Sequence, residues 1–534
     1  MSPPAEISIN RRSLLLGTAG ATAAAALGAP KPASAASGRR IPLTREEHRV
    51  VIIGSGFGGG VTALRFAQAG VPSLVLERGI RWPTGPNAET FPHATSPDNR
   101  MFWLGSRVSI FGIPIPGFAS PYTGLLQVVG GNGMDVICAA GVGGGSLVYQ
   151  GMTMQPSETL FNATMPEGLD YARMNSEYYP RVASMLRLQT APDELVGSRS
   201  YQPSRIFARN VGNAGYELSK IPMPIDWNFA LRELKGEMKP SYTNGDCALG
   251  VNNGGKHSVD VTYIAAAEAT GLARVATQHN VTDVAQARDG RWEVRVDRIA
   301  TDGTVLENKI ITAKALVMAA GTVNTTRLLM RAAAKGQIPD LPDGLGTNWG
   351  SNGDRIYVWT NYWDDFGNPQ GGPVVYGSKA WGDIATANTV IQASLPPLPA
   401  NLRSTMLVGY GISQGRGRYV YDSAKDDAIL NWPAGADDTL YKKINARVQK
   451  IAGPLSTLVD TTAAYPSTWH PLGGASMEIV CDLAGRVHGH RGLYVLDGAL
   501  MPGTTAACNP SMTIAAVAER ATDELIAQDA GTVF

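Results

Sequence analysis

Three glycines at fixed spacing form the clearest chemical motif in this chain. Gly54, Gly56 and Gly59 make a G-x-G-x-x-G pattern directly after the apolar run Val50–Ile53 and before a helical stretch. In that context the glycines let a pyrophosphate approach the backbone N–H groups at a helix N-terminus. Glu77 ends the next apolar segment, where a carboxylate can accept hydrogen bonds from ribose hydroxyls and would repel a 2′-phosphate. The pattern predicts a dinucleotide site rather than an ordinary Gly-rich turn.

Three later segments favour FAD over NAD as that dinucleotide. Residues 141–146 (GVGGGS) lie between apolar flanks and would let the backbone lie against a flat ring system. Residues 315–322 (ALVMAAGT) are typical of a strand that returns small residues to the nucleotide. Asp497-Gly498 follows the apolar residues 494–496 and would place a carboxylate near the ribityl chain and pyrophosphate. Each segment alone is a common turn or loop, so their order along the chain is the basis of the inference.

The elements that must position these residues are spread along the chain. We expect an α/β fold with a Rossmann-type FAD-binding domain built from discontinuous segments, namely 45–80, 130–154, 251–345 and 470–534. Alternating, aromatic-rich segments such as 356–363 indicate an antiparallel sheet. With helices, that sheet forms the predicted substrate domain, residues 155–250 and 346–469. Residues 81–129 are apolar and loop-like, and they are interpreted as an entrance lid or as core between the domains.

Composition limits the function and the compartment. The chain has 534 residues and a net charge of +1, which argues against nucleic-acid partners and against more than transient contact with a membrane surface. Residues 1–37 combine Arg11-Arg12, an Ala/Gly-rich apolar run and a small-residue cleavage site at 33–35. This order predicts a twin-arginine signal and a secreted protein rather than a disordered tail. The four cysteines form no CxxC pair, so no zinc site is expected, and whether any form disulfides stays open.

The motifs together resemble the glucose–methanol–choline (GMC) family of flavin oxidoreductases. Within that family, the chain is most similar to the bacterial cholesterol oxidases that bind FAD without a covalent link. The similarity runs from about residue 48 to the C-terminus. Beyond Gly54–Gly59, it is found in GVGGGSLV at 141–148, NNGGKHSVDVTYIAAA at 252–267, WHPLGG at 469–474, YVLDGALMPG at 494–503 and NPSMTIAAVAER at 509–520.

The resemblance implies that His470 and Asn509 are the catalytic pair. An alcohol that loses hydride must also lose its hydroxyl proton, which an imidazole can accept, while an amide can anchor the same oxygen. A lone histidine is otherwise more often structural. The expected cofactor contacts are Gly54, Gly56, Phe57, Gly59, Glu77, Gly141, Gly143, Gly144, Gly145, Ser146, Gly321, Asp497, Gly498, Asn509, Pro510 and Thr513. The expected substrate contacts are Met152, Gln392 and Ser394.

The chain also departs from the cholesterol oxidases. Those enzymes carry a glutamate that moves a proton during double-bond isomerisation, whereas the corresponding region here offers Gln392 or Ser394. Tyr149 replaces an asparagine that follows the Gly-rich stretch. No histidine lies between His93 and His257, which disfavours a covalent flavin–histidine link. The His488-x-His490 pair is interpreted as a surface turn rather than a metal site, because no acidic or Cys cluster accompanies it.

The expected function is FAD-dependent oxidation of a bulky, apolar secondary alcohol, such as a sterol-like 3-hydroxyl, to the ketone. Molecular oxygen would be reduced to hydrogen peroxide, a steroid double bond would not be isomerised, and the protein would be a monomer. One alternative is a GMC-type dehydrogenase of a non-sterol alcohol that passes electrons to a quinone or a protein. A second, of another class, is an exported lipid-binding flavoprotein without turnover.

Overall fold

The computed structural model describes residues 40–105, 108–110, 113–115 and 120–534. The chain divides into a short N-terminal unit, Met1–Ile41, and a unit of Pro42–Phe534, to which all that follows refers. The predicted signal peptide, residues 1–37, lies outside the described residues.

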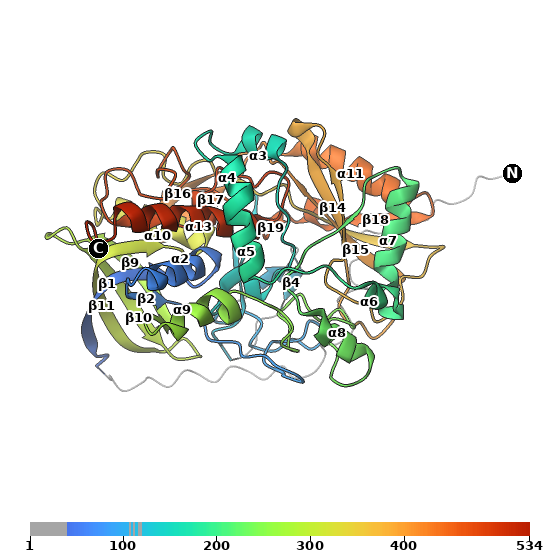
Figure 1. Cartoon of the computed structure of the whole chain (residues 1–534), viewed down its shortest axis with the longest axis horizontal. Helices are drawn as coiled ribbons and strands as arrows, with labels where there is room; N and C mark the ends of the chain where they lie inside the picture. Colours follow the sequence, from blue (N-terminus) through green and yellow to red (C-terminus); the bar gives the residue numbers. More distant parts are fainter. Residues whose placement is uncertain (1–39, 106–107, 111–112, 116–119) are drawn as a thin grey trace. The chain divides into compact units, whose positions relative to one another are not determined.

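A mixed sheet forms one half of this unit (Figure 1). Its described strands run in the order β8–β2–β1–β11–β10–β9, and β20 pairs with β11. β1, β2, β8, β11 and β20 are parallel, whereas β9 and β10 join antiparallel. The bounds are β1 Leu43–Ile53, β2 Ser73–Leu76, β8 Ala273–Ala276, β9 His279–Gln286, β10 Trp292–Ile299, β11 Val305–Met318 and β20 Leu493–Val495. Segments from both ends of the sequence therefore share one sheet.

Helices cover this sheet and begin at its site-forming edge. The main ones are α2 Phe57–Gln68, α10 Thr322–Ala334, α13 Pro510–Gln528 and the short α9 Ala265–Ala269. α2 starts after the short turn that follows β1. Gly58 in its first turn allows the helix to approach the chain after β20 closely. A Cβ on Gly58 would lie 1.7 Å from the Leu496 carbonyl oxygen. The predicted strand–turn–helix–strand unit of residues 50–77 is thus confirmed.

A fully antiparallel sheet forms the other half, in the order β18–β12–β15–β14–β13–β7 among the described strands. Its bounds are β7 Ser219–Lys220, β12 Arg355–Asn361, β13 Tyr376–Ala380, β14 Asn388–Ala393, β15 Ser404–Gly411 and β18 Ser456–Asp460. Helices α7 Gln202–Asn213 and α11 Asp438–Ala452 pack on it through a core that includes Phe207, Trp359 and Ile444. The sequence expectation of an α/β fold with an antiparallel second sheet is confirmed.

Shorter elements connect the two sheets. They are β3 Val108–Ile110, β4 Ile113–Ile115, β5 Leu126–Val129, β6 Asp135–Ala139, α3 Glu158–Thr164, α4 Tyr171–Arg173, α5 Tyr179–Met185, α6 Asp193–Gly197, α8 Trp227–Leu234, β16 Arg418–Asp422, β17 Asp427–Asn431, α12 Thr461–Ala464 and β19 Ser467–Thr468. β19, β6 and β5 form a separate small sheet that leads into the Gly-rich stretch.

The apolar segment 81–129 contributes core where it is described. Trp82, Phe91, Phe102 and Leu125 are buried in one cluster, in which the Trp82 and Phe91 rings stack 5.3 Å apart. These side chains are therefore core residues, and the place of the segment between the domains stays a prediction. That the segment also admits substrate stays a prediction.

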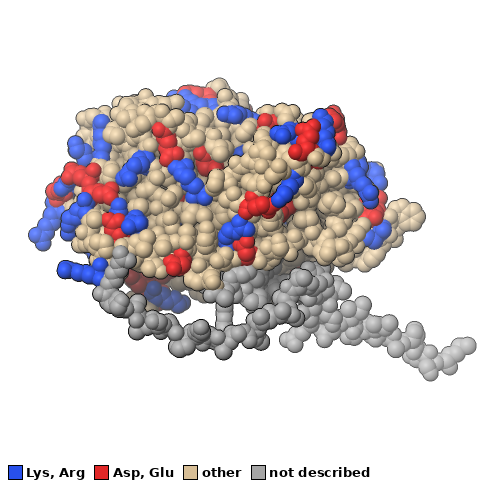
Figure 2. Space-filling model, turned by 90° about the horizontal axis from the view of Figure 1, so that it is seen from below, with Lys and Arg blue, Asp and Glu red and all other residues tan. Residues whose placement is uncertain are grey.

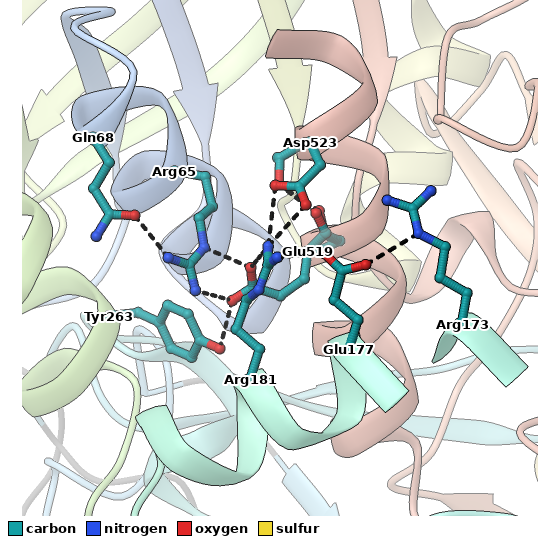
Figure 3. A network of polar contacts seen from close by, with 10 residues as sticks. Arg65, Gln68, Arg173, Glu177, Arg181, Tyr263, Glu519 and Asp523 are labelled. Carbon is teal, nitrogen blue, oxygen red and sulfur yellow. Dashed lines mark hydrogen bonds and ion pairs between the residues drawn. The ribbon is translucent and has the colours of Figure 1, made fainter. Parts of the chain in front are cut away.

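An ion pair joins α2 and α13, the first and last helices that cover the mixed sheet (Figure 3). Glu519 of α13 is fully buried and accepts hydrogen bonds from Nε and Nη2 of Arg65 in α2, at 2.5 and 2.7 Å. Tyr263 Oη and Arg181 of α5 also donate to Glu519, at 2.9 and 3.3 Å. Asp523, partly exposed, takes a second contact from Arg181. The bidentate pair fixes α2 against α13.

Glu519→Gln is expected to lower the free energy of unfolding by ~3 kcal/mol, because the fully buried carboxylate that pairs with the partly buried Arg65 and Arg181 loses its charge. Denaturant titration of the purified protein measures the change. Asp523→Asn is the matched control: its carboxylate is exposed at the edge of the same network, so its loss should cost at most about 1 kcal/mol. Equal losses of unfolding free energy in the two variants would show that burial does not determine how much Glu519 contributes to stability.

Surface charge on the face shown in Figure 2 is mixed, with basic and acidic side chains interspersed and neither sign forming a continuous patch. Within the described ranges, no helix combines the length and the apolar character that crossing a bilayer requires.

Candidate active site

A single groove brings most of the predicted site residues together. It encloses about 500 Å³, within the range of cofactor and ligand sites. Its wall includes, from the predicted set, Gly54, Gly56, Phe57, Glu77, Gly144, Gly145, Gly321, His470, Asp497, Gly498, Asn509 and Pro510. The residues come from both ends of the chain because the ends of β1, β11 and β20 meet at this edge.

The fingerprint turn forms one end of the groove. Gly54 has a φ of +97°, and a Cβ there would lie 2.2 Å from the Ala319 carbonyl oxygen. Gly56 is the N-cap of α2 and makes no side-chain cap, so the first N–H groups of the helix are available to a ligand. Gly56 and Gly144 approach each other closely across the groove wall. This cradle of backbone donors suits the pyrophosphate of a dinucleotide.

Glu77 ties the two Gly-rich segments together. Its Oε2 accepts from Ser55 Oγ at 2.6 Å, and its Oε1 accepts from the N–H groups of Gly79 and Gly141 at 2.9 and 3.2 Å. The carboxylate therefore holds the turn after β1 against the Gly-rich stretch. Contact between Glu77 and a ribose stays a prediction, since its oxygens already accept hydrogen bonds within the protein.

Asp497 has the corresponding role at the third Gly-containing turn. Its Oδ2 accepts from Gly321 N–H at 2.9 Å and from Thr325 Oγ1 at 2.6 Å, and its Oδ1 accepts from Ala499 N–H at 2.8 Å. Burial raises the pKa of this carboxyl to about 6, although those hydrogen bonds oppose the shift. A Cβ on Gly321 would meet no atom within 4 Å, so this turn is open to the groove.

His470 also lies on the groove wall, and hydrogen bonds fix its orientation. Its Nδ1 is 2.7 Å from Asp354 Oδ1, and Oδ2 of the same carboxylate accepts from Thr468 Oγ1 at 2.8 Å and from Trp469 N–H at 3.1 Å. A carboxylate only accepts hydrogen bonds, so Nδ1 carries a hydrogen and donates a hydrogen bond to Asp354. With Nδ1 as the donor, Nε2 is the acceptor nitrogen of the ring.

Asn509 lies next to His470 on the groove wall. Its Nδ2 is 3.3 Å from His470 Nε2, and its Oδ1 is buried without a hydrogen-bond partner. Asn509 is also the N-cap of α13, whose first turn begins with Pro510. A buried carbonyl oxygen without a donor fits a site completed by a ligand N–H or O–H. The pair can therefore hold a hydroxyl and take its proton.

Five other predicted cofactor residues support the groove from behind. Gly59 packs against the Gly54 carbonyl, and Ser146 Oγ donates to the Gly143 carbonyl at 2.7 Å. Thr513 is buried and bonds the Tyr179 hydroxyl. None of these residues, nor Gly141, belongs to the described groove wall.

The three predicted substrate residues are not brought to the groove. Gln392 on β14 accepts from Ser204 Oγ and donates to Thr405 Oγ1, each at 3.0 Å. Ser394 donates to the Gly371 carbonyl, and Met152 is buried in the core of the antiparallel half. All six residues of β14 are buried, so the strand reaches no open surface. These side chains are already satisfied inside the antiparallel half and are absent from the described groove wall, so their contact with a substrate stays a prediction.

Sequence reasoning missed Asp354. It lies 116 residues before His470, in a turn with no recognisable motif, and only the packing of the two halves brings the pair together. Trp469 and Tyr149 also line the groove. Trp469 stands inside the WHPLGG motif, which could have marked it. His490 bonds the Asp340 carbonyl, and all four cysteines are unpaired thiols. Over the described ranges, no three His, Cys, Asp or Glu side chains gather to hold a metal ion.

Comparison with known proteins places this geometry in context. Two family descriptions of GMC oxidoreductases match residues 16–349 and 425–518. A cholesterol oxidase of Acinetobacter baumannii is 25% identical, with 90% of this chain and 94% of that protein covered. A cholesterol oxidase of Mycobacterium tuberculosis is 26% identical over 89% and 91%. The structure of a fungal aryl-alcohol oxidase superposes with a TM-score of 0.61 at 15% identity, covering 91% of this chain and 99% of that one.

Proposed function

The chain belongs to the GMC oxidoreductase family, and from that membership we propose that it oxidises a bulky, apolar secondary alcohol to the ketone. The family implies FAD and an alcohol substrate. The observation that best supports the finer proposal is the Asp354–His470–Asn509 arrangement, with one unpartnered amide oxygen. Its His470 and Asn509 share a groove wall with the dinucleotide fingerprint.

The residues suggest how the proton of the alcohol is handled. FAD, when bound, supplies the acceptor for hydride. His470 Nε2 is placed to accept the hydroxyl proton, and Asp354 holds the correct tautomer and stabilises the imidazolium that results. Asn509 orients the hydroxyl oxygen beside Nε2. The N-terminus of α2 and the turns at Gly54 and Gly321 would hold the diphosphate and ribityl chain.

A sterol-like 3-hydroxyl is the proposed substrate, and oxygen the proposed acceptor. Both proposals are supported by the similarity of the chain to two cholesterol oxidases. A screen of sterols and other alcohols tests them: anaerobic bleaching of bound flavin identifies substrates, and peroxide release under air identifies an oxidase. Bleaching without oxygen consumption would indicate a dehydrogenase. A flavoprotein that no alcohol bleaches would instead be a lipid-binding protein without turnover.

The purified protein is expected to be yellow and to release intact FAD when denatured. Two histidines, His279 and His470, belong to the described groove wall, and each already bonds another group, the Thr277 carbonyl and Asp354 respectively. Neither is placed as a free tether. Precipitation in acid followed by chromatography of the supernatant measures the release, and flavin that stays with the chain would contradict non-covalent binding.

A 3β-hydroxy-5-ene steroid, if oxidised, is expected to leave as the unconjugated 5-en-3-one. Conjugation needs a base that takes a proton from C4 and returns one to C6. The carboxylates on the described groove wall are Glu77, Asp427 and Asp497. All three already bond protein groups, with Asp427 paired to Arg327. Rapid-quench ultraviolet spectra distinguish the products. Conjugated enone formed faster than in buffer alone would mean that another carboxylate reaches the steroid.

A further inference from the structure

Lys256 places a buried ammonium directly behind the groove wall. Its Nζ donates to the Leu147 carbonyl at 2.9 Å and to the Tyr149 carbonyl at 2.6 Å. The same Nζ lies 4.7 Å from the centroid of the Tyr149 ring. Only 7% of the residue's surface is exposed, so this cation has exchanged water for two carbonyls and one aromatic face.

No carboxylate neutralises this charge within the described ranges. Lys256 makes no ion pair there, and the ionisable groups that influence it are Cys247 and Asp260. Asp260 is itself held by the Ser258 hydroxyl. Burial lowers the pKa of Lys256 to about 7, which shows how strongly the site disfavours the charge, and the ammonium is protonated at pH 6. Burial of an unpaired cation costs free energy of folding, which indicates a functional role for its charge.

The segment between Lys256 and the groove is thin. It consists of the 3-10 turn Gly144–Leu147 and of Tyr149, and Gly144, Gly145 and Tyr149 all belong to the groove wall. The Tyr149 ring meets Phe57 edge-on, with centroids 5.5 Å apart, and Phe57 also lines the groove. The Tyr149 hydroxyl is buried without a partner. One aromatic ring therefore separates the ammonium from the groove.

We propose that Lys256 is a positioning residue that holds Tyr149 in the groove wall and whose positive charge stabilises negative charge on the flavin ring. This inference rests on the proposed binding of FAD in the groove. A reduced flavin carries more negative charge than an oxidised one, so a nearby buried cation favours the reduced state. The same cation favours the addition of sulfite, an anion, to the oxidised ring.

The test compares Lys256→Met, which removes the charge, with Lys256→Arg, which keeps it. Sulfite affinity is read at pH 6 from bleaching of bound flavin, and the midpoint potential is measured beside it. Lys256→Met is expected to weaken sulfite binding about tenfold and to lower the two-electron potential by about 30 mV. Lys256→Arg should stay within about twofold of the parent. Lys379→Met is the matched control, because Lys379 also lies over an aromatic ring, Trp381, but neither residue belongs to the groove wall.

The outcomes separate this inference from the proposed function. A protein that neither contains nor takes up flavin would overturn the function. A Lys256→Met variant that binds flavin with the parent's sulfite affinity and potential would overturn the role of the charge. An equal loss in Lys256→Met and Lys256→Arg would do the same, because it would point to packing alone. Should the methionine variant fail to fold, Lys256→Gln provides the same comparison while keeping a donor for the two carbonyls.

Discussion

His470→Ala is expected to slow flavin reduction by alcohol by ~10²–10⁴-fold, the usual effect of removing a group that accepts a proton in the rate-limiting step. His470 lies on the groove wall, and its Nε2 is the acceptor nitrogen of the ring, 3.3 Å from the amide Nδ2 of Asn509. Without it, the hydroxyl proton has no acceptor when hydride leaves. Stopped-flow measurement of flavin bleaching under anaerobic conditions gives the rate directly.

The same variant should still bind FAD, since the fingerprint turn and the Asp497 turn do not depend on the imidazole. His488→Ala serves as the control for loss of a histidine, because His488 is exposed and absent from the groove wall. Near-normal bleaching in His470→Ala would assign the ring a structural role and leave the base to be found elsewhere.

Asp354→Asn is expected to lower kcat by ~10²-fold with little change in KM. Oδ1 and Oδ2 together accept three hydrogen bonds, from His470 Nδ1, Thr468 Oγ1 and Trp469 N–H. An amide replaces one acceptor oxygen by an N–H₂ group that only donates, so the three contacts cannot all persist. If the amide N–H₂ turns toward His470, the ring is forced into the tautomer with a protonated Nε2 and loses its acceptor at that nitrogen.

Steady-state kinetics over a range of alcohol concentrations separates kcat from KM, and the flavin content shows whether the fold is intact. Asp437→Asn controls for the loss of a buried carboxylate, because Asp437 bonds Ser413 and the N–H groups of Gln414 and Gly415 away from the groove. A similar fall in kcat for both variants would mean that stability, rather than the His470 tautomer, explains the effect.

The nucleotide half could be predicted because its signals are local. The apolar run of β1, the glycine spacing and the acidic end of β2 lie within 30 residues, and each is set by short-range physics: strand burial, left-handed turns and a free helix N-terminus. The place of His470 followed from a resemblance, and the structure adds the reason for its orientation.

The substrate side could not be predicted in the same way. Gln392 and Ser394 lie on or just after a strand that is buried on both faces, and no alternation in the sequence distinguishes a groove-facing side from a core-facing side there. Asp354 and His470 meet only because the antiparallel sheet packs beside the mixed one, a tertiary relation that residue spacing does not encode.

The link between α2 and α13 also determines when this protein can mature. Arg65 and Glu519 are 454 residues apart, so at about 5–20 residues per second a ribosome needs roughly 20–90 s to make the partner of a helix already synthesised. β11, once made, lacks β20 on one side until residues 493–495 follow, and the cradle lacks the turn at Asp497 until then. The cradle is therefore complete only after Asp497 has been synthesised. Translation of an mRNA truncated near its 3′ end would give a chain that has the fingerprint turn but lacks β20, the Asp497 turn and α13.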